Sequence, residues 1–366
     1  MVATIDEKKV MEVLGKLQDP ELHMPLMKLN MIRDICIDDA GVSFTVMLTT
    51  PACPLKSQIE GDAKKALMAV AGVGQVNIKF GAETLRAMPS GPSQTPAASG
   101  ATLIPEVKNV IAVGSGKGGV GKSTVAVNLA VALAKLGAKV GLLDADIYGP
   151  SVPLLTSVKA CTLESDGKTM IPAFNYGVKI ISMGFFIKDS DPVIWRGPML
   201  HGIIQKFLGE VRWGELDYLV IDLPPGTGDV QLSLSQMIPI SAAVVVTTPQ
   251  DVALLDVRRA VYMFKKVRVE VAGVIENMSA FECPHCHEET KIFGEGAGEK
   301  IHQEFQVPLL GRIALTKSLM ESGEKGTPIV ASDPESVTAK SFIATAQQLA
   351  GAVSVLNFRR PKVEIV

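Results

Sequence analysis

Two patterns of apolar residues alternate along this 366-residue chain from about residue 108 onward. Short uninterrupted apolar runs predict buried strands, whereas apolar residues spaced three or four positions apart predict helices. Buried strands that alternate with helices are typical of a doubly wound, mostly parallel α/β sheet covered on both faces. The expected strands are 110–113, 139–144, 178–183, 217–223, 242–248, 271–278 and, at an edge, 308–313, and an amphipathic helix over 335–353 is expected to pack on them.

The first 86 residues follow a separate and smaller pattern. It predicts, in order, a helix over 5–17, a hairpin from 31–37 and 42–48, a helix over 54–70 and a strand over 75–80. Residues 87–106 are rich in Pro, Ser, Gly and Ala and lack periodicity, as flexible linkers do. We therefore expect a small α/β domain over 1–86, a linker over 87–106 and a larger domain over 107–366.

A glycine-rich motif, G-x-x-x-x-G-K-[ST], lies between the strand 110–113 and a helix marked by Val125, Leu129 and Leu133. Strand before and helix after is the context of a P-loop, where backbone N–H groups and the positive helix end surround phosphates. The dinucleotide motif G-x-G-x-x-G also fits, but it gives no role to a lysine followed by two hydroxyl residues. The predicted phosphate-binding residues are Gly116, Lys117, Gly118, Gly119, Val120, Gly121, Lys122, Ser123 and Thr124.

The two lysines of this loop have different expected roles. Lys122 should reach the β- and γ-phosphates, while the Ser123 hydroxyl binds Mg²⁺. The earlier Lys117 gives the spelling KGGVGKST, which resembles the deviant Walker A group of P-loop ATPases, including the MinD, ParA and nitrogenase iron-protein relatives. The resemblance implies that Lys117 contacts the phosphates of a partner chain, so that the protein hydrolyses ATP as a homodimer.

Carboxylates follow two of the predicted strands, at the sheet edge where ligands of such folds bind. Asp222 ends an apolar strand, which is the Walker B placement near Mg²⁺, and the following PPGTGD resembles a switch region. The resemblance also implies that Asp146 orients the attacking water and that Asp144 lies nearer the metal. Ordinary turn-forming or capping roles are the alternative, and the neighbouring P-loop favours catalysis.

Two further residues are candidates for the adenine pocket. Asn277 ends the strand in GVIENMS, and in the resembling superfamily an asparagine there contacts adenine, since its amide offers a donor and an acceptor. Pro249, in TTPQDVAL, lies in a comparable place beside Gln250. An amide is also common at strand ends for purely structural reasons.

Cys283-Pro-His-Cys286 permits four hypotheses. A thioredoxin-type dithiol would open an amphipathic helix, but HEETKIFGEG has no helical stripe. A zinc site could add His302, yet no second histidine follows at 306–308. Both cysteines could be incidental. Finally, an iron–sulfur cluster needs about four thiolates, and two chains related by a two-fold axis would supply them.

The cysteines of the first domain give weaker signals. DPELHMPLMKLNMIRDI and TTPACPLKSQIEGDAKKAL resemble the SufT-like family associated with iron–sulfur assembly, in which a cysteine occupies the position of Cys53. A helix N-terminus there would favour a thiolate, whereas a small buried residue at a turn is the alternative. Cys36 lies in an apolar strand and is expected to pack.

Taken over nearly the whole chain, the motifs resemble the Mrp/ApbC family of iron–sulfur carrier ATPases. They comprise GKGGVGKST, DADIYGPSVP, WRGPM, DYLVIDLPPGTGD, TTPQDVALLDVRRA and CPHC. The resemblance implies a homodimer that binds a bridging cluster, expected to be 4Fe–4S, at Cys283 and Cys286. It also implies receipt of the cluster from scaffold proteins and transfer to apo-proteins. The extra four-cysteine N-terminal site of eukaryotic relatives has no counterpart here.

The composition and net charge limit the classes of partner that we expect. A net charge of −2 gives no general electrostatic case for nucleic acid or an anionic membrane, and no run is apolar for the length of a bilayer. MVATIDEKKV has no secretory or transit character, so a cytoplasmic location is expected. Two rival hypotheses are a positioning or partition ATPase, for which LNFRRPKVEIV gives no membrane helix or basic face, and an ATP-driven electron-transfer reductase.

Overall fold

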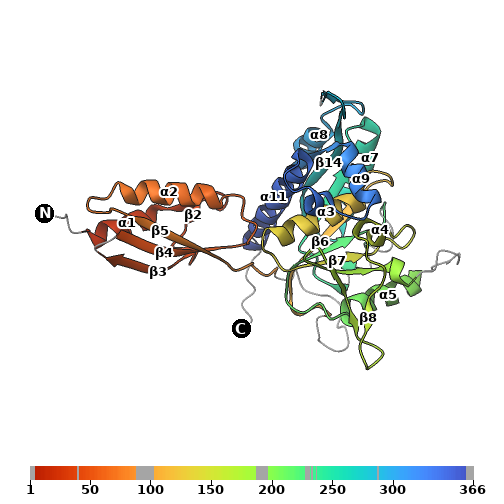
Figure 1. Ribbon diagram of the computed structural model, residues 1–366, viewed down its shortest axis with the longest axis horizontal. Coiled ribbons are helices and arrows are strands. Elements are labelled where there is room, and N and C mark those ends of the chain that lie inside the picture. The colour runs from red at the N-terminus through yellow and green to blue at the C-terminus, as the bar shows by residue number, and fades with distance from the viewer. Residues whose placement is uncertain are drawn as a thin grey trace. The chain divides into compact units, whose positions relative to one another are not determined.

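The computed structural model describes residues 5–38, 41–87, 103–186, 197–226, 231, 234–235, 237–286 and 288–359. It divides into two compact units, Met1–Leu85 and Arg86–Val366, which are considered separately here (Figure 1). Most of the predicted linker, residues 88–102, lies outside the described residues, as do residues 195–196 of WRGPM and 227–229 of PPGTGD.

The first unit packs two helices on a three-stranded sheet. Its elements are α1 (Glu7–Lys16), β1 (Gln18–Asp19), β2 (Met24–Pro25), β3 (Ile32–Asp38), β4 (Gly41–Leu48), α2 (Lys56–Met68) and β5 (Val76–Ala82). The predicted hairpin is confirmed as the antiparallel pair β3–β4, and β5 runs parallel to β4 on its other side. Leu14 of α1 and Leu67 of α2 pack with Phe44 of β4 in one apolar cluster.

Cys36 does not pack, contrary to the expectation from sequence. It is exposed on β3, because the pairing with β4 shifts between Arg33 and Cys36. Asp34 lies within that irregularity with a left-handed φ of 54°. An extra residue at such a bulge reverses the alternation of inward and outward side chains, so Cys36 faces solvent.

In the second unit, nine strands of the described residues form one sheet. Their order is β10-β11-β7-β12-β6-β13-β14, with β15 and β16 both paired to β14. β10 and β15 pair antiparallel, and the other neighbours pair in parallel. The strands are β6 (Val107–Ser115), β7 (Val140–Asp144), β10 (Ala173–Asn175), β11 (Val178–Ser182), β12 (Leu216–Asp222), β13 (Ala242–Thr247), β14 (Val271–Glu282), β15 (Glu289–Thr290) and β16 (Leu309–Leu315).

Helices cover both faces of this sheet, as the apolar pattern predicts (Figure 1). Along β6, Val110 and Ala112 join one core cluster with α5 (Gly197–Gly209), α7 (Asp251–Lys266) and α8 (Ala297–Phe305). The alternate residues Ile111 and Val113 are equally buried, and successive strand side chains point to opposite faces. The other face carries α3 (Lys122–Lys135) and α11 (Val337–Arg359), which contact each other.

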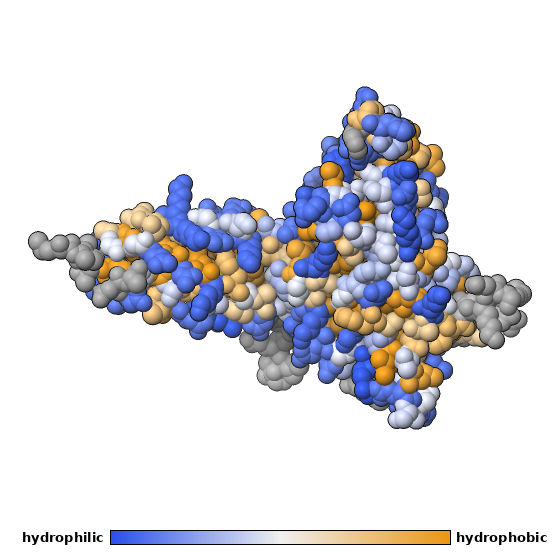
Figure 2. Space-filling view, viewed as in Figure 1, coloured by the Kyte–Doolittle hydropathy of each residue, from blue (hydrophilic) through white to orange (hydrophobic). Residues whose placement is uncertain are grey.

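Shorter elements complete the unit. They are α4 (Val152–Thr156), the pair β8 (Thr162–Leu163) and β9 (Met170–Ile171), the 3₁₀ turn η1 (Met183–Phe185), α9 (Lys317–Glu324) and α10 (Ile329–Ser332). Hydrophobic and hydrophilic residues are interspersed over the visible surface (Figure 2). Among the described residues, no helix combines the length and apolar character needed to cross a bilayer.

Parallel pairing brings the ends of four strands together. Asp222 of β12 pairs with Val113 of β6 on one side and with Asp144 of β7 on the other. Asp144 in turn pairs with Ser182 of β11. The residues that end these strands therefore lie in a row beside the loop that follows β6.

Candidate nucleotide site and cysteine hairpin

The phosphate loop lies between β6 and α3, as predicted. Gly119 and Gly121 both have φ of +78°, a left-handed conformation that glycine adopts without steric cost. Gly116 is required for a different reason, because a Cβ there would lie 2.3 Å from the backbone of Asp256 in α7. α3 begins at Lys122, so its unpaired N–H groups face the loop and form an anion-binding end.

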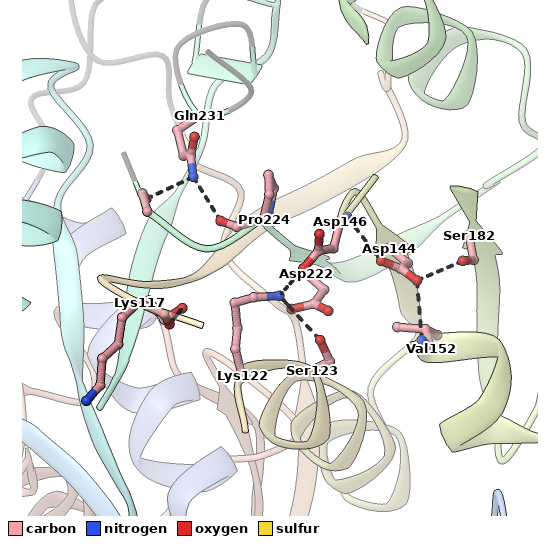
Figure 3. A network of polar contacts seen from close by, with 12 residues as sticks. Lys117, Lys122, Ser123, Asp144, Asp146, Val152, Ser182, Asp222, Pro224 and Gln231 are labelled. Atoms are coloured by element: carbon pink, nitrogen blue, oxygen red, sulfur yellow. Dashed lines mark hydrogen bonds and ion pairs between the residues drawn. The ribbon is translucent and has the colours of Figure 1, made fainter. Parts of the chain in front are cut away.

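Lys122 is the centre of the polar network in Figure 3. Its ammonium Nζ lies 2.6 Å from Oδ1 of Asp222 and 3.5 Å from Oδ2 of Asp146, and its side chain is only 6% exposed. It also lies 3.3 Å from the Ser123 hydroxyl. The structure therefore brings together three residue types of the predicted site, which come from positions up to 100 residues apart.

The two carboxylates beside Lys122 retain unused oxygens. Oδ2 of Asp222 and Oδ1 of Asp146 are buried and have no hydrogen-bond partner among the described residues. Burial raises the pKa of Asp222, and the Lys122 cation opposes that shift. Buried carboxylate oxygens without donors are suited to a hard divalent cation or its water ligands, so the donor set fits the predicted Mg²⁺.

Asp144 is held differently. Its Oδ2 accepts hydrogen bonds from the Ser182 hydroxyl at 2.7 Å and from the N–H of Val152 at 3.3 Å, and its Oδ1 accepts from the N–H of Asp146 at 3.1 Å. Burial, and then the charge of Asp222, raise the pKa of Asp144 to about 7, although these hydrogen bonds favour the ionised form. These bonds orient the segment that carries Asp146; the metal-side role of Asp144 stays a prediction.

Lys117 lies in the same loop but points away from Lys122 and the carboxylates (Figure 3). Its carbonyl accepts a 2.9 Å hydrogen bond from Ser115 Oγ, which fixes the backbone at this point. Its side chain is half-buried and forms no ion pair with the described residues. The action of Lys117 across a dimer stays a prediction.

Of the two adenine candidates, Asn277 contacts the phosphate loop, and the adenine role of both stays a prediction. Nδ2 of Asn277 donates a 2.8 Å hydrogen bond to the carbonyl of Val120, so in this structure the amide holds the phosphate loop. Pro249 is buried in the segment between β13 and α7. The contribution of Asn277 to loop geometry was not foreseen from its strand-end position.

Gln231 and Ser182 are site residues that sequence reasoning missed. Nε2 of Gln231 donates to the carbonyls of Pro224 at 3.0 Å and Gly226 at 3.1 Å (Figure 3). It thereby holds the start of the predicted switch region after Asp222. A polar residue five positions beyond PPG, and a serine next to last in the predicted strand 178–183, were the available signals.

Cys283 and Cys286 lie at the tip of a hairpin between β14 and β15. Phe281 and Glu282 pair with Thr290 and Glu289, and the N–H of Cys283 donates to the carbonyl of Glu288. Cys283 is half-buried and Cys286 is exposed, with no disulfide between them. β14 extends to Glu282, beyond the predicted end at residue 278. Its last residues pair with β15, and their sequence lacks the alternation of apolar and polar residues from which a strand is predicted.

This geometry bears on the four hypotheses for the pair. The cysteines open no helix, which removes the expected context of a thioredoxin-type dithiol. Nδ1 of His302 lies 3.0 Å from the carbonyl of Val307, so that ring is engaged at the end of α8. Among the described residues, which omit His287, no group of three or more potential ligands could hold a metal ion.

The surroundings of Cys53 favour the alternative of a small buried residue at a turn. It is half-buried beside the start of α2, and burial raises the pKa of its thiol to about 11, with smaller contributions from Glu21 and Asp19. Backbone N–H groups of Leu55 and Lys56 oppose the shift without reversing it. The helix N-terminus therefore lowers the pKa of the thiol, but desolvation outweighs it, which favours the alternative of a small buried residue.

Known proteins match both units. Residues 106–350 match the family described as NUBPL iron-transfer P-loop NTPase, and residues 7–79 match a family described as iron-sulfur cluster assembly protein. The chain belongs to the NUBPL iron-transfer P-loop NTPase family. Two relatives of this family member, each named iron-sulfur cluster carrier protein, come from Synechocystis and Deinococcus radiodurans. They are 51% and 48% identical, covering 94% of this chain and 97% and 95% of their own lengths.

Solved structures agree with the fold of this P-loop NTPase. A nucleotide-binding protein from Archaeoglobus fulgidus, in complex with ADP, is 40% identical with a TM-score of 0.54 over 60% of this chain and 87% of its own. The cell division ATPase MinD from Pyrococcus furiosus has a TM-score of 0.50 at 24% identity, over 66% and 98%. The second likeness concerns the fold alone.

Proposed function

We propose that this chain is an ATP-hydrolysing iron–sulfur cluster carrier that works as a homodimer. The observation that carries the proposal is the pair Cys283 and Cys286 at a hairpin tip, half-buried and exposed respectively, which presents two thiols in the same compact unit as the phosphate loop. Relatives covering nearly the whole chain are named iron-sulfur cluster carrier proteins. A 4Fe–4S cluster is the cargo, held by two thiolates from each chain.

The nucleotide site assigns the remaining roles. Lys122 and the loop N–H groups bind the phosphates, while Ser123 and Asp222 face Mg²⁺. Mg²⁺ would neutralise charge developing on the phosphates. Asp146, with an unused buried oxygen, orients the attacking water, and Lys117 stabilises the partner's transition state. Asn277 and Pro249 border the base.

Domain organisation follows the same proposal. Residues 1–86 form a small domain, 87–106 a linker and 107–366 the ATPase domain. The ATPase domain holds the cargo.

A transfer assay tests the function directly. The anaerobically reconstituted chain is mixed with an apo-form 4Fe–4S enzyme, and recovery of that enzyme's activity is followed with Mg·ATP and without it. We expect recovery from the loaded chain that free iron and sulfide at equal concentration do not match in rate. Equal rates, with an excess of chelator abolishing both, would contradict a carrier; electron delivery without cluster loss would support the reductase hypothesis.

A further inference from the structure

β14 joins the two functional regions in one continuous segment. Asn277, which holds the phosphate loop, and Cys283, which opens the cysteine pair, are separated by six positions of this strand, or about 20 Å of extended chain. Glu276 anchors the strand just before Asn277. Its buried carboxylate accepts from the N–H of Gly298 at 2.9 Å and from Nε of Arg312 at 3.3 Å.

The phosphate loop lies directly against this segment. Nδ2 of Asn277 bonds the Val120 carbonyl, and a Cβ on Gly121 would lie only 2.3 Å from that nitrogen. The same position lies 3.8 Å from Cε of Met278. A displacement of residues 120–121 must therefore move Asn277, break its hydrogen bond, or move the residue that follows.

Beyond Asn277, the strand leaves regular geometry. Met278 has a left-handed φ of 54°, which is uncommon for a residue other than glycine and marks a site held by its surroundings. Pairing with β16 passes from Asn277 opposite Ile313 to Phe281 opposite Leu315. Four steps along β14 thus match two along β16, and the segment between them is not restrained by regular ladder bonds.

We propose that β14 couples the phosphate loop to the cysteine pair, with Asn277 as the positioning residue and the left-handed Met278 as the pivot. When phosphates reorder the loop, the Asn277 bond transmits the change along β14 in the direction away from the Glu276 anchor, and the hairpin carrying Cys283 and Cys286 shifts. The inference rests on the proposed function, since the coupling would make the affinity for the cluster depend on the nucleotide state. The geometry itself concerns the chain before any cluster is loaded.

Thiol reactivity in the cluster-free, reduced full chain tests this coupling. Iodoacetamide alkylation of each cysteine is timed by mass spectrometry, with and without Mg²⁺ and saturating adenylyl imidodiphosphate. In the natural sequence we expect the rate at Cys283 or Cys286 to change by about fivefold or more, the lower end of measured couplings between sites. The exposed Cys36, in the other unit, is the internal standard and should not change.

Two variants should uncouple the sites. Asn277→Ala removes the bond to the loop, and Met278→Gly makes the pivot pliable without touching that bond. Each is assayed at a nucleotide concentration that its own titration shows to be saturating, and the response should fall below about twofold. Asn175→Ala is the matched control, because Asn175 makes the same kind of bond, to the Thr156 carbonyl at 3.0 Å, far along the sheet. It should keep the full response.

Two results would overturn the coupling: no nucleotide response in the natural sequence, or a full response in both Asn277→Ala and Met278→Gly. Cluster content of the natural sequence is measured separately. A chain that holds no cluster but shows the thiol response refutes the proposed function and leaves the coupling intact. A chain that holds a cluster without the response refutes the coupling alone.

Discussion

The phosphate loop and the cysteine hairpin lie in the same unit but differ in completeness. Lys122, Asp222 and Asp146 are buried and already oriented by one another, so one chain builds most of that site. Cys283 and Cys286 stand at a hairpin tip, half-buried and exposed, with no further ligand gathered among the described residues. The phosphate site is thus largely preorganised by folding, whereas the hairpin presents two thiols, and the proposed function requires a second copy to complete the ligand set.

The largest expected effect separates the two regions. Cys283→Ala or Cys286→Ala leaves two of four thiolates in a dimer, so the cluster should be absent or labile after reconstitution. Nucleotide binding should survive, because the residues of the phosphate loop are all retained. Iron and sulfide analysis alongside a nucleotide titration measures both, with Cys36→Ala as the matched control. A cluster that persists in the double variant would move the ligands to another region, with Cys53 the next candidate.

Lys117→Ala tests whether the phosphate site is also shared between chains. If the side chain acts on the partner's phosphates, as an arginine finger does in trans, hydrolysis should fall by roughly 10³–10⁵-fold while nucleotide still binds. Steady-state phosphate release and a binding titration distinguish the two. Hydrolysis at the normal rate would remove the sandwich dimer from the mechanism.

Asp146→Asn tests the role of the unused oxygen beside Lys122. The substitution keeps the size of the side chain but removes the charge that orients water, so turnover should slow by about 10²–10⁴-fold with ATP still bound. Single-turnover hydrolysis is the direct measurement. Turnover at the natural rate would assign the role elsewhere, first to Asp144.

Lys122→Ala should weaken nucleotide binding and leave cluster binding in place, which is the converse of the cysteine variants. Truncating one member of a buried charge pair costs about 2–5 kcal/mol, which corresponds to nucleotide affinity weakened by roughly 30- to 4,000-fold. The cluster should still bind at the hairpin. Lys135→Ala, at the exposed far end of α3, is the matched control, and unfolding midpoints of both are recorded to detect the loss of the Asp222 ion pair. Normal affinity in Lys122→Ala would contradict the assigned P-loop role.

The smallest expected effect is a pH dependence of the free energy of unfolding, which arises at Asp144 in the phosphate site and not at the cysteine hairpin. The pKa of Asp144 rises from 3.8 to about 7 in the folded chain, first through burial. The folded state therefore keeps a proton that the unfolded chain releases, so the free energy of unfolding should fall as pH rises across that interval. Asp144→Asn should flatten that slope in urea titrations at several pH values. An identical slope in the variant would place the titration on another group.

Local patterns were sufficient to predict the phosphate loop and seven strands of the main sheet, but not the short antiparallel strands β10 and β15. Buried runs such as 217–223 and the glycine spacing at 116–121 depend on near neighbours in sequence, and the structure has them there. Long-range contacts were not predictable: the Asn277 bond to Val120 joins residues 157 positions apart. Cys36 was expected to pack, but a bulge exposes it. The burial that favours the structural alternative for Cys53 depends on contacts that the local sequence does not encode. The bridging role of Cys283 depends on a second copy and stays a prediction.

The most direct test is the mass and metal content of the anaerobically reconstituted chain. Native mass spectrometry, with iron and sulfide analysis on the same sample, gives the number of chains per cluster. We expect a dimer that carries one 4Fe–4S cluster for every two chains and separates into monomers when the cluster is removed by chelation without nucleotide. A monomer that retains one zinc ion per chain, or a complete cluster within a single chain, would contradict the shared half-site.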